Sequence, residues 1–396
     1  MRRPAFIALL IGVAGVSPLG INMYLPSMPG MARALGADFA TVQLTLSLYL
    51  AAMAVGQLIV GPLSDRFGRR PVLLGGLLVF VLGSAVCLAA PSVGILIAGR
   101  VVQALGGCAG IALTRAMVAD LYGRDQAASM LAYVTMGMAV APMIAPTIGG
   151  VLETLHGWRA TFAFLTGYGG LILLLSALFL AETHRDRGGA GGVGKLLRSY
   201  PGLFRSRLFW GYALTNGFVS AVFFAFLAGA PFVVIELLGR SPAEYGAWFA
   251  FVPCGYILGN FATGRLATRF GPDRLILVGT LMLLASVGAM AAAFGAGVAH
   301  PAAMFCPMFF MGVASGLVLP SGVAGAVSVK PEVAGAAAGL SGSLQMAFGA
   351  AVAPVVGAAL GTTVWPLVAI MAACAALAIA CFLVGVGVGA RPGRAV

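Results

Sequence analysis

The stretch GPLSDRFGRRP, residues 61–71, is a short basic segment between two long apolar runs, 41–61 and 72–90. Gly61 and Gly68 permit a tight, non-helical turn, because glycine adopts backbone conformations that other residues avoid. A related segment, GRLATRFGPDR, recurs at 264–274, about half a chain length later. A basic turn that recurs between apolar runs predicts two repeats of membrane-spanning helices.

The composition supports a membrane protein. Of the 396 residues, 61% are hydrophobic and only 9% are charged, which is too little charge for the surface of a soluble protein of this length. The net charge of +12 could indicate nucleic-acid binding. However, the basic residues lie in short loops between apolar runs, which is the pattern of membrane topology. We therefore expect no nucleic-acid partner.

The apolar runs predict an all-α protein with twelve membrane-spanning helices, since about 20 apolar residues cross a bilayer. Continuous runs exclude a β-barrel, whose strands alternate in polarity. The predicted spans are 5–28, 41–61, 72–90, 94–117, 129–152, 160–181, 208–234, 245–264, 275–295, 303–325, 333–359 and 364–388. We predict two six-helix bundles, 1–181 and 208–396, joined by a glycine-rich, basic linker at 182–207.

The loops also predict the orientation of the chain. With the N-terminus inside, most of the 23 basic residues lie on the cytoplasmic side. Arg33, Arg159 and Arg240 lie outside, and Arg100 lies within a span. This asymmetry places both termini in the cytoplasm and the protein in the bacterial inner membrane as a multi-pass protein.

The loop at 61–71 closely resembles the signature loop of the major facilitator superfamily. With QLTLSLYLAAMAVGQLIVGPLSDRFGRRPVLL (43–74), it is similar to the bicyclomycin and chloramphenicol resistance branch of the drug/proton antiporters. RVVQALGGCAG (100–110) and GWRATF (157–162) extend the resemblance along the chain. The resemblance implies the major facilitator fold and multidrug efflux, and hence antibiotic resistance, by alternating access.

The loop residues are candidates for a gate. Charges there can latch the two halves together on the inside, and an ordinary positive-inside loop is the alternative. The resemblance implies that Asp65 meets the start of the helix near 333–338, and that Arg66 or Arg70 pairs with Asp120. The predicted gating residues are Gly61, Asp65, Arg66, Gly68, Arg69, Arg70 and Asp120.

The fifth predicted span contains APMIAPTIGG, residues 141–150. Prolines bend helices and glycines allow close packing, so this segment is a plausible rocking surface. The resemblance identifies it as an antiporter-type motif, and a simple packing kink is the alternative. Its candidate residues are Pro142, Pro146, Gly149 and Gly150.

Polar and aromatic side chains within the spans predict a substrate cavity. Arg100 either faces this cavity or extends to the outer interface, and Gln103 lies one turn further on the same face. Each of the others can instead serve helix packing. The candidates are Asn22, Tyr24, Arg100, Gln103, Tyr133, Met136, Asn216, Phe223, Tyr256, Met308 and Gln345.

None of the eleven acids is placed in the middle of a span. The resembling branch usually has Asp-Met-Tyr-Leu-Pro in its first helix, where this chain has Asn22-Met23-Tyr24-Leu25-Pro26. Asparagine does not titrate near neutral pH, so proton coupling through this position is not expected. We predict that the Asn22 oxygen accepts a hydrogen bond from Arg100, which lies at a similar depth. A bond from Asn22 to a neighbouring helix is the alternative.

The leading functional hypothesis is an inner-membrane exporter of small amphipathic, drug-like compounds. One alternative is a uniporter or exchanger of a metabolite such as an anion, given the uncompensated charge of Arg100. A transport-inactive sensor or scaffold is the alternative from another class. No enzyme activity, metal or cofactor is expected, because nucleophile–base pairs, metal-ligand spacings and nucleotide-binding loops are missing. The expected partners are a small-molecule substrate, membrane lipid and, through the resemblance, protons.

Overall fold

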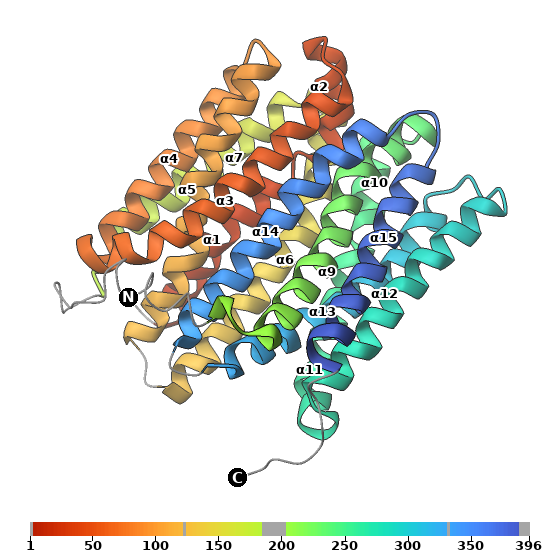
Figure 1. Cartoon of the computed structure of the whole chain (residues 1–396). Coiled ribbons are helices and arrows are strands. Elements are labelled where there is room, and N and C mark those ends of the chain that lie inside the picture. The colour runs from red at the N-terminus through yellow and green to blue at the C-terminus, as the bar shows by residue number, and fades with distance from the viewer. Residues whose placement is uncertain (1–2, 122–123, 184–202, 331–332, 388–396) are drawn as a thin grey trace. The chain divides into compact units, whose positions relative to one another are not determined.

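The computed structural model describes residues 3–121, 124–183, 203–330 and 333–387. Within these ranges it leaves out the side chains of residues 3–5, 124–129, 131–133, 135–137, 139 and 334. Every regular element in the described part of the chain is a helix (Figure 1). The chain divides into two compact units.

The first unit comprises Met1–Val193, Ala228–Ala250 and Ala353–Ala358. It includes segments from the second half of the sequence, which pack on helices of the first half. In Figure 1 the long helices α3, α4, α5 and α7 of this unit run beside one another. Its elements are α1 (Arg3–Asn22), η1 (Leu25–Ser27), α2 (Met28–Leu35), α3 (Phe39–Phe67), α4 (Arg69–Ala89), α5 (Val93–Leu121), α6 (Arg124–His156), α7 (Arg159–Phe179), η2 (Val233–Leu237) and α10 (Pro242–Phe249).

The second unit comprises Gly194–Leu227, Phe251–Val352 and Ala359–Val396. Its core is formed by α11 and α12, which both pack on α13. Two helices, α9 and α14, contribute residues to both units. The elements are α9 (Arg207–Phe232), α11 (Phe251–Phe270), α12 (Pro272–Gly295), α13 (Ala302–Ser328), α14 (Ala334–Ala359), α15 (Trp365–Phe382) and η4 (Leu383–Gly387).

The described residues contain ten helical segments that are long and apolar enough to cross a membrane. The predicted span at 129–152 lies in α6, where many side chains are not described. The predicted span at 245–264 is divided at Ala250 into α10 and α11, so neither piece carries the full apolar run. The predicted span at 5–28 is interrupted as well, because α1 ends at Asn22 and the chain continues through η1 into α2.

The repeated loop has the same backbone in both copies. Gly68 joins α3 to α4 with φ +97°, and Gly271 joins α11 to α12 with φ +78°. The Gly68 N–H donates to the Ser64 carbonyl, and the Gly271 N–H donates to the Ala267 carbonyl, both at 3.0 Å. Positive φ favours glycine. The sequence repeat is therefore a structural repeat at this turn.

Two helices begin at side-chain caps. Asp38 accepts a hydrogen bond from the Thr41 N–H at 3.1 Å at the start of α3. The Thr41 side chain, followed by this N–H, lowers the pKa of Asp38. Ser241 and Glu244 form a reciprocal capping box at the start of α10.

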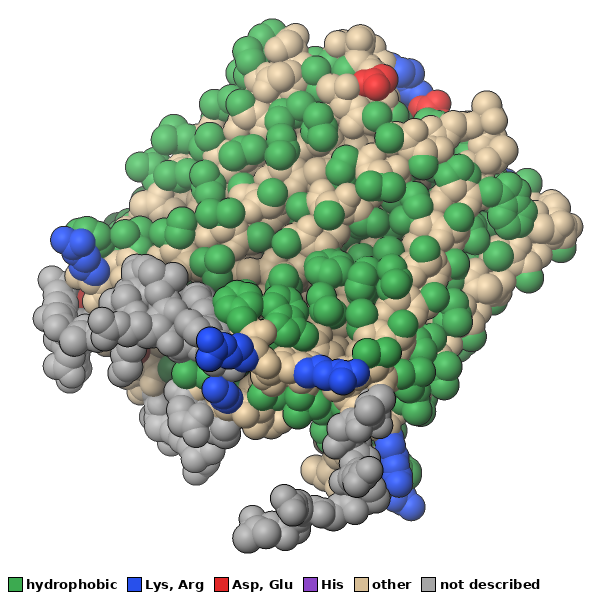
Figure 2. All heavy atoms as spheres, viewed as in Figure 1, with side chains coloured by type: hydrophobic (Ala, Val, Ile, Leu, Met, Phe, Trp, Pro, Cys, Tyr) green, Lys and Arg blue, Asp and Glu red, His purple; other side chains and the backbone are tan. Residues whose placement is uncertain are grey.

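The surface carries large apolar side chains, such as Ile59 on α3, Leu82 on α4, Val278 on α12 and Leu377 on α15. Figure 2 shows hydrophobic side chains spread across the visible face. Such a surface is unfavourable in water, whereas it suits lipid tails. The surface therefore agrees with a membrane-spanning protein.

Candidate functional site

A fully buried arginine lies at the centre of the first unit. Arg100, on α5, has no exposed surface. Its guanidinium carbon lies 3.9 Å from the centroid of the Tyr24 ring and 4.1 Å from that of Tyr49. Stacking between two aromatic rings stabilises a desolvated cation. Because Arg100 is enclosed, it does not extend to the membrane interface as the alternative interpretation required.

The hydrogen bonds of Arg100 go to neutral groups. Its Nη1 donates to the Gly20 carbonyl at 2.8 Å and to Gln103 Oε1 at 2.5 Å. Gln103 Nε2 in turn donates to Ser84 Oγ, at 2.7 Å. Arg100 Nε and Nη2 are buried without a hydrogen-bond partner, and no ion pair of Arg100 is found among the described residues. The unit therefore holds an uncompensated buried cation.

The predicted hydrogen bond between Asn22 and Arg100 is wrong in this structure. Asn22 Nδ2 donates to the Pro18 carbonyl at 2.8 Å, and its buried Oδ1 has no partner in the part of the chain that the structure describes. The prediction assumed a continuous helix through residue 28. Because α1 ends at Asn22, the chain turns there and Tyr24, rather than Asn22, covers the guanidinium.

The predicted gating loop forms a charged cluster centred on Arg69. Its Nε lies 3.1 Å from Asp120 Oδ2, and its Nη1 donates to Ser64 Oγ at 2.6 Å and to Asp65 Oδ1. The arginine that pairs with Asp120 is thus Arg69, rather than Arg66 or Arg70. The turn at Gly68 directs Arg69 back toward α3 and α5, whereas Arg66 is exposed and stacks on Phe67.

Sequence reasoning missed Glu182, which lies just after α7. Its Oε1 accepts from the Arg69 N–H at 2.9 Å and its Oε2 from the Arg70 N–H at 3.2 Å, so it caps the start of α4. A carboxylate is stabilised at a helix N-terminus by the free N–H groups and the helix dipole. The family resemblance implies that Asp65 meets the start of the helix near 333–338. In the structure Asp65 accepts a hydrogen bond from Arg69. The contact between Asp65 and the helix near 333–338 stays a prediction.

We predict that Arg69→Gln lowers the free energy of unfolding by about 2 kcal/mol, since it leaves Asp120 half-buried without its cation. Arg66→Gln is the matched control, because it removes the same charge from an exposed position. Thermal unfolding in detergent measures both. Equal melting temperatures for the two variants would contradict the assignment of Arg69 as the centre of the cluster.

The predicted motif at 141–150, on α6, packs closely against the backbone of two other segments. A Cβ on Gly149 would lie 1.8 Å from the Met23 carbonyl oxygen, and one on Gly150 would lie 2.2 Å from that of Pro242. A Cβ on Gly246, on α10, would lie 2.3 Å from the Pro146 carbonyl oxygen. We call Gly149, Gly150 and Gly246 the glycine contact. Gly246 was missed because nothing in the sequence near it marks a motif.

Further polar contacts join the two halves of the sequence within the first unit. Thr147 Oγ1 donates to the Gly246 carbonyl at 2.8 Å. Arg33 and Glu236 form an ion pair at 2.6 Å. The Gln43 side chain donates to the Ala228 carbonyl. These contacts join α2, α3 and α6, from the first half of the sequence, to residues 228–250 of the second half.

A second polar cluster lies in the second unit. Asn216 Nδ2 donates to the Leu319 carbonyl at 3.2 Å, and its Oδ1 is buried without a partner against Gly322. Ser220, one turn along α9, donates to Gln345 Oε1 at 3.3 Å. The structure therefore brings Asn216 and Gln345 together with Ser220, which sequence reasoning missed because serine is common in packed membrane helices.

The other predicted cavity residues are placed as follows. Met308 is fully buried in α13, whereas Phe223 on α9 and Tyr256 on α11 are partly exposed. Tyr133 and Met136 lie in α6, but their side chains are outside the described residues. Pro142 and Pro146 lie within a continuous α6. Contact with a substrate stays a prediction for all of them.

Comparison with known proteins places these features in a family. The model of the Major Facilitator Superfamily matches residues 10–345. The uncharacterized MFS-type transporter YdgK of Bacillus subtilis is 34% identical over 92% of this chain and 91% of its own. The chloramphenicol resistance protein of Pseudomonas aeruginosa is 33% identical over 83% of this chain and 76% of its own. Multidrug resistance protein D of Escherichia coli is 30% identical, over 87% and 86%.

Solved structures share the fold at low sequence identity. The D-xylose–proton symporter superposes with a TM-score of 0.73 at 14% identity, over 94% of this chain and 97% of that chain. An inward-facing, occupied bacterial homologue of the human lysosomal transporter Spinster gives a TM-score of 0.71 at 16% identity, over 97% and 94%. These likenesses support the fold and say nothing of the substrate.

Proposed function

Because the chain belongs to the Major Facilitator Superfamily, we propose that it exports small amphipathic, drug-like compounds across the bacterial inner membrane by alternating access. Family membership makes it a membrane transporter rather than an enzyme. The resistance proteins among its relatives support a drug-like substrate. Within this proposal, residues 1–181 and 208–396 are the two moving bundles, and 182–207 is the linker, most of which lies outside the described residues.

The glycine contact is the observation that carries the proposal. Segments from both halves of the sequence meet there through bare backbone, with no side chain between them. A surface of this kind can close tightly and separate again, because few interlocked side chains have to be released. We assign it to the outer end of the transporter, where the Arg33–Glu236 ion pair lies beside water. Opening of this end is one half of an alternating-access cycle.

The substrate cavity is proposed to use the Asn216 cluster together with Phe223, Tyr256 and Met308. Asn216 Oδ1 has no hydrogen-bond partner among the described residues. The aromatic and methionine side chains suit varied apolar ligands, because they adapt without strict hydrogen-bond demands. We place Arg100 behind Tyr24 as a source of positive potential rather than as an exposed contact.

A second candidate function follows from Arg100. An uncompensated buried cation favours an acidic or electron-rich group nearby. This would suit a uniporter or exchanger of an anionic metabolite. The two functions differ in their dependence on the transmembrane pH gradient and in their substrates.

Transport by purified protein in proteoliposomes tests the proposal. We expect uptake of at least one compound from a panel of antibiotics into inverted vesicles, measured with and without an imposed pH gradient. A parallel panel of small carboxylates tests the second candidate. Transport of a carboxylate, with no antibiotic transported, would reject drug export in favour of the anionic substrate.

The proposed topology predicts cysteine reactivity. In a variant without native cysteines, Gly189→Cys should be labelled by an impermeant maleimide only in inverted membranes, since the linker faces the cytoplasm. Ala299→Cys, between α12 and α13, is the matched control, and we expect its labelling in intact cells. The reverse pattern would overturn the assignment of sides.

A further inference from the structure

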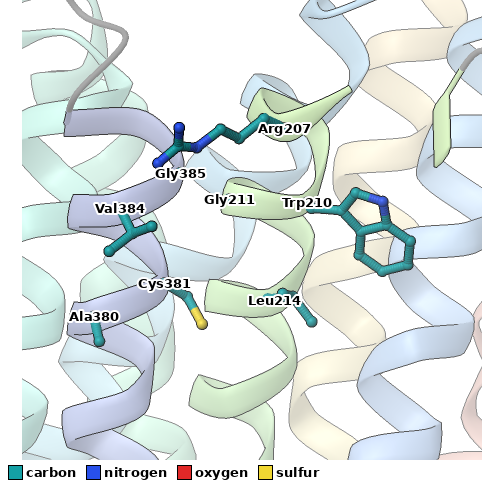
Figure 3. A pocket seen from close by; sticks show the side chains of 8 residues that line it. All are labelled: Arg207, Trp210, Gly211, Leu214, Ala380, Cys381, Val384 and Gly385. Carbon is teal, nitrogen blue, oxygen red and sulfur yellow. The ribbon is translucent and has the colours of Figure 1, made fainter. Parts of the chain in front are cut away.

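A groove lies between α9 and the end of α15, within the second unit. Its volume is about 290 Å³, which is far larger than the roughly 10–15 Å³ that a cavity needs to hold one water molecule. Figure 3 shows Arg207 at one end of the groove and Leu214 and Ala380 at the other. The remaining lining residues are Trp210, Gly211, Cys381, Val384 and Gly385. Apart from Arg207, the walls offer almost only apolar groups.

The groove exists because small residues line both helices. Glycines bring α9 and α15 into contact at one level, and a small side chain leaves space open at the next. A Cβ on Gly385 would lie 2.3 Å from the Gly211 Cα, so the two backbones touch there. Gly385 belongs to the π-helical turn η4, which widens the end of α15. Ala380, one turn away, is too short to close the gap toward Leu214. An elongated apolar slot results.

The mouth of the groove carries an available positive charge. Arg207 is exposed, and among the residues that the structure describes it forms no ion pair. In Figure 3 its guanidinium extends across the groove toward Gly385. Trp210 is half-buried beside it, and its indole N–H donates to the Phe204 carbonyl at 2.9 Å. Arginine and tryptophan at the first turn of a spanning helix mark the headgroup level of the bilayer.

We propose that this groove binds one anionic phospholipid, with an acyl chain between α9 and α15 and the phosphate at Arg207. The apolar slot matches the chain, and the unpaired guanidinium matches the charge of the headgroup. Trp210, whose ring points away from α15 in Figure 3, lies at the same level of α9, where a flat amphipathic side chain is favoured. The site needs only that Arg207 lies at the membrane boundary, so it holds for either orientation of the chain and does not rest on the proposed substrate.

Native mass spectrometry of the purified transporter tests the site. The probes are phosphatidylglycerol and phosphatidylcholine with identical acyl chains, so that only the headgroup charge differs. We expect the wild type to retain phosphatidylglycerol preferentially. Arg207→Gln should weaken phosphatidylglycerol binding about fivefold, the change expected from roughly 1 kcal/mol for a basic residue near the membrane surface. Arg265→Gln, which removes an exposed arginine from α11, should leave it unchanged.

A second arm tests the acyl-chain slot. Ala380→Phe should fill the groove and reduce retention of both lipids, whereas Ala373→Phe places the same side chain on α15 outside the lining. Melting temperatures establish that the variants are folded, and Cys381→Leu is a smaller filling substitution should Ala380→Phe fail to fold. Equal retention of the two lipids by the wild type would overturn the proposal. So would a preference for phosphatidylglycerol that survives Arg207→Gln, or wild-type lipid retention by a folded filled variant.

Discussion

The variant Gly150→Ala should insert and fold but transport at least roughly tenfold more slowly than the wild type. The added Cβ would lie 2.2 Å from the Pro242 carbonyl oxygen, well inside contact distance. The atom it meets is backbone within a helix, so neither side can move away without separating α6 from α10. Overpacking of this kind costs about 1–3 kcal/mol, and about 1.4 kcal/mol corresponds to a tenfold change in an equilibrium. The closed arrangement of this end would become the minor state.

The same effect should arise from the other side of the contact. Gly246→Ala places a Cβ 2.3 Å from the Pro146 carbonyl oxygen, and we expect a similar loss. Gly167→Ala on α7 is the matched control, since no atom lies within 4 Å of the added carbon. Proteoliposome transport measures the rate. Reactivity of a cysteine placed at Ser27, which is buried beside α6, measures opening.

Opposite changes in the two measurements are expected if the contact is a gate, with transport falling and Ser27→Cys reactivity rising. If Gly150→Ala is slow but its cysteine stays as protected as in the wild type, the contact is structural packing and not a moving surface. If Gly167→Ala is equally slow, α6 and α10 have no special role.

The fold could be predicted from sequence because its main determinant is local. Long apolar runs must form helices in a bilayer, and the loop at 61–71 recurs with the glycine that its turn needs. Gly68 and Gly271 both have positive φ, and each donates its N–H to the carbonyl four residues earlier. Each of these facts depends on a few adjacent residues, which a single sequence displays.

Interruptions within the apolar runs could not be predicted in the same way. Hydropathy measures how well a segment dissolves in lipid and is insensitive to where a helix bends. Hydropathy therefore did not predict the end of α1 at Asn22 or the division between α10 and α11 at Ala250. The first break changed the site, because it brought Tyr24 over Arg100 in place of Asn22.

Side-chain partners across helices were the least predictable feature. Asp120 lies 51 residues after Arg69, and three arginines near the turn were equally suitable by charge. Only the direction of the chain after Gly68 selects Arg69. Glu182 could not be identified from the sequence either, because a carboxylate that follows a helix is usually just exposed to solvent. Its role depends on the start of α4, which is distant in sequence.

The second large effect is expected from Asn22→Asp, which should make transport depend on the pH gradient. In the wild type the amide Nδ2 donates to the Pro18 carbonyl, while Asn22 Oδ1 and two nitrogens of Arg100 have no hydrogen-bond partner within the described ranges. An ionised aspartate cannot donate to Pro18 and would be drawn to those free Arg100 donors. A protonated aspartate can keep the bond to Pro18 as asparagine does. The two protonation states therefore favour different partners.

A group that exchanges one proton in each cycle can change the transport rate by up to about tenfold per pH unit. We therefore expect the Asn22→Asp variant to respond to an imposed gradient in proteoliposomes and the wild type to respond little. Asn22→Ala is the matched control, because it removes the amide without adding a titratable group, and its pH profile should follow that of the wild type. A wild type that is already strongly driven by the gradient would place coupling at another residue. An aspartate variant whose pH profile is unaltered would mean that a titratable group at position 22 takes no part in proton movement.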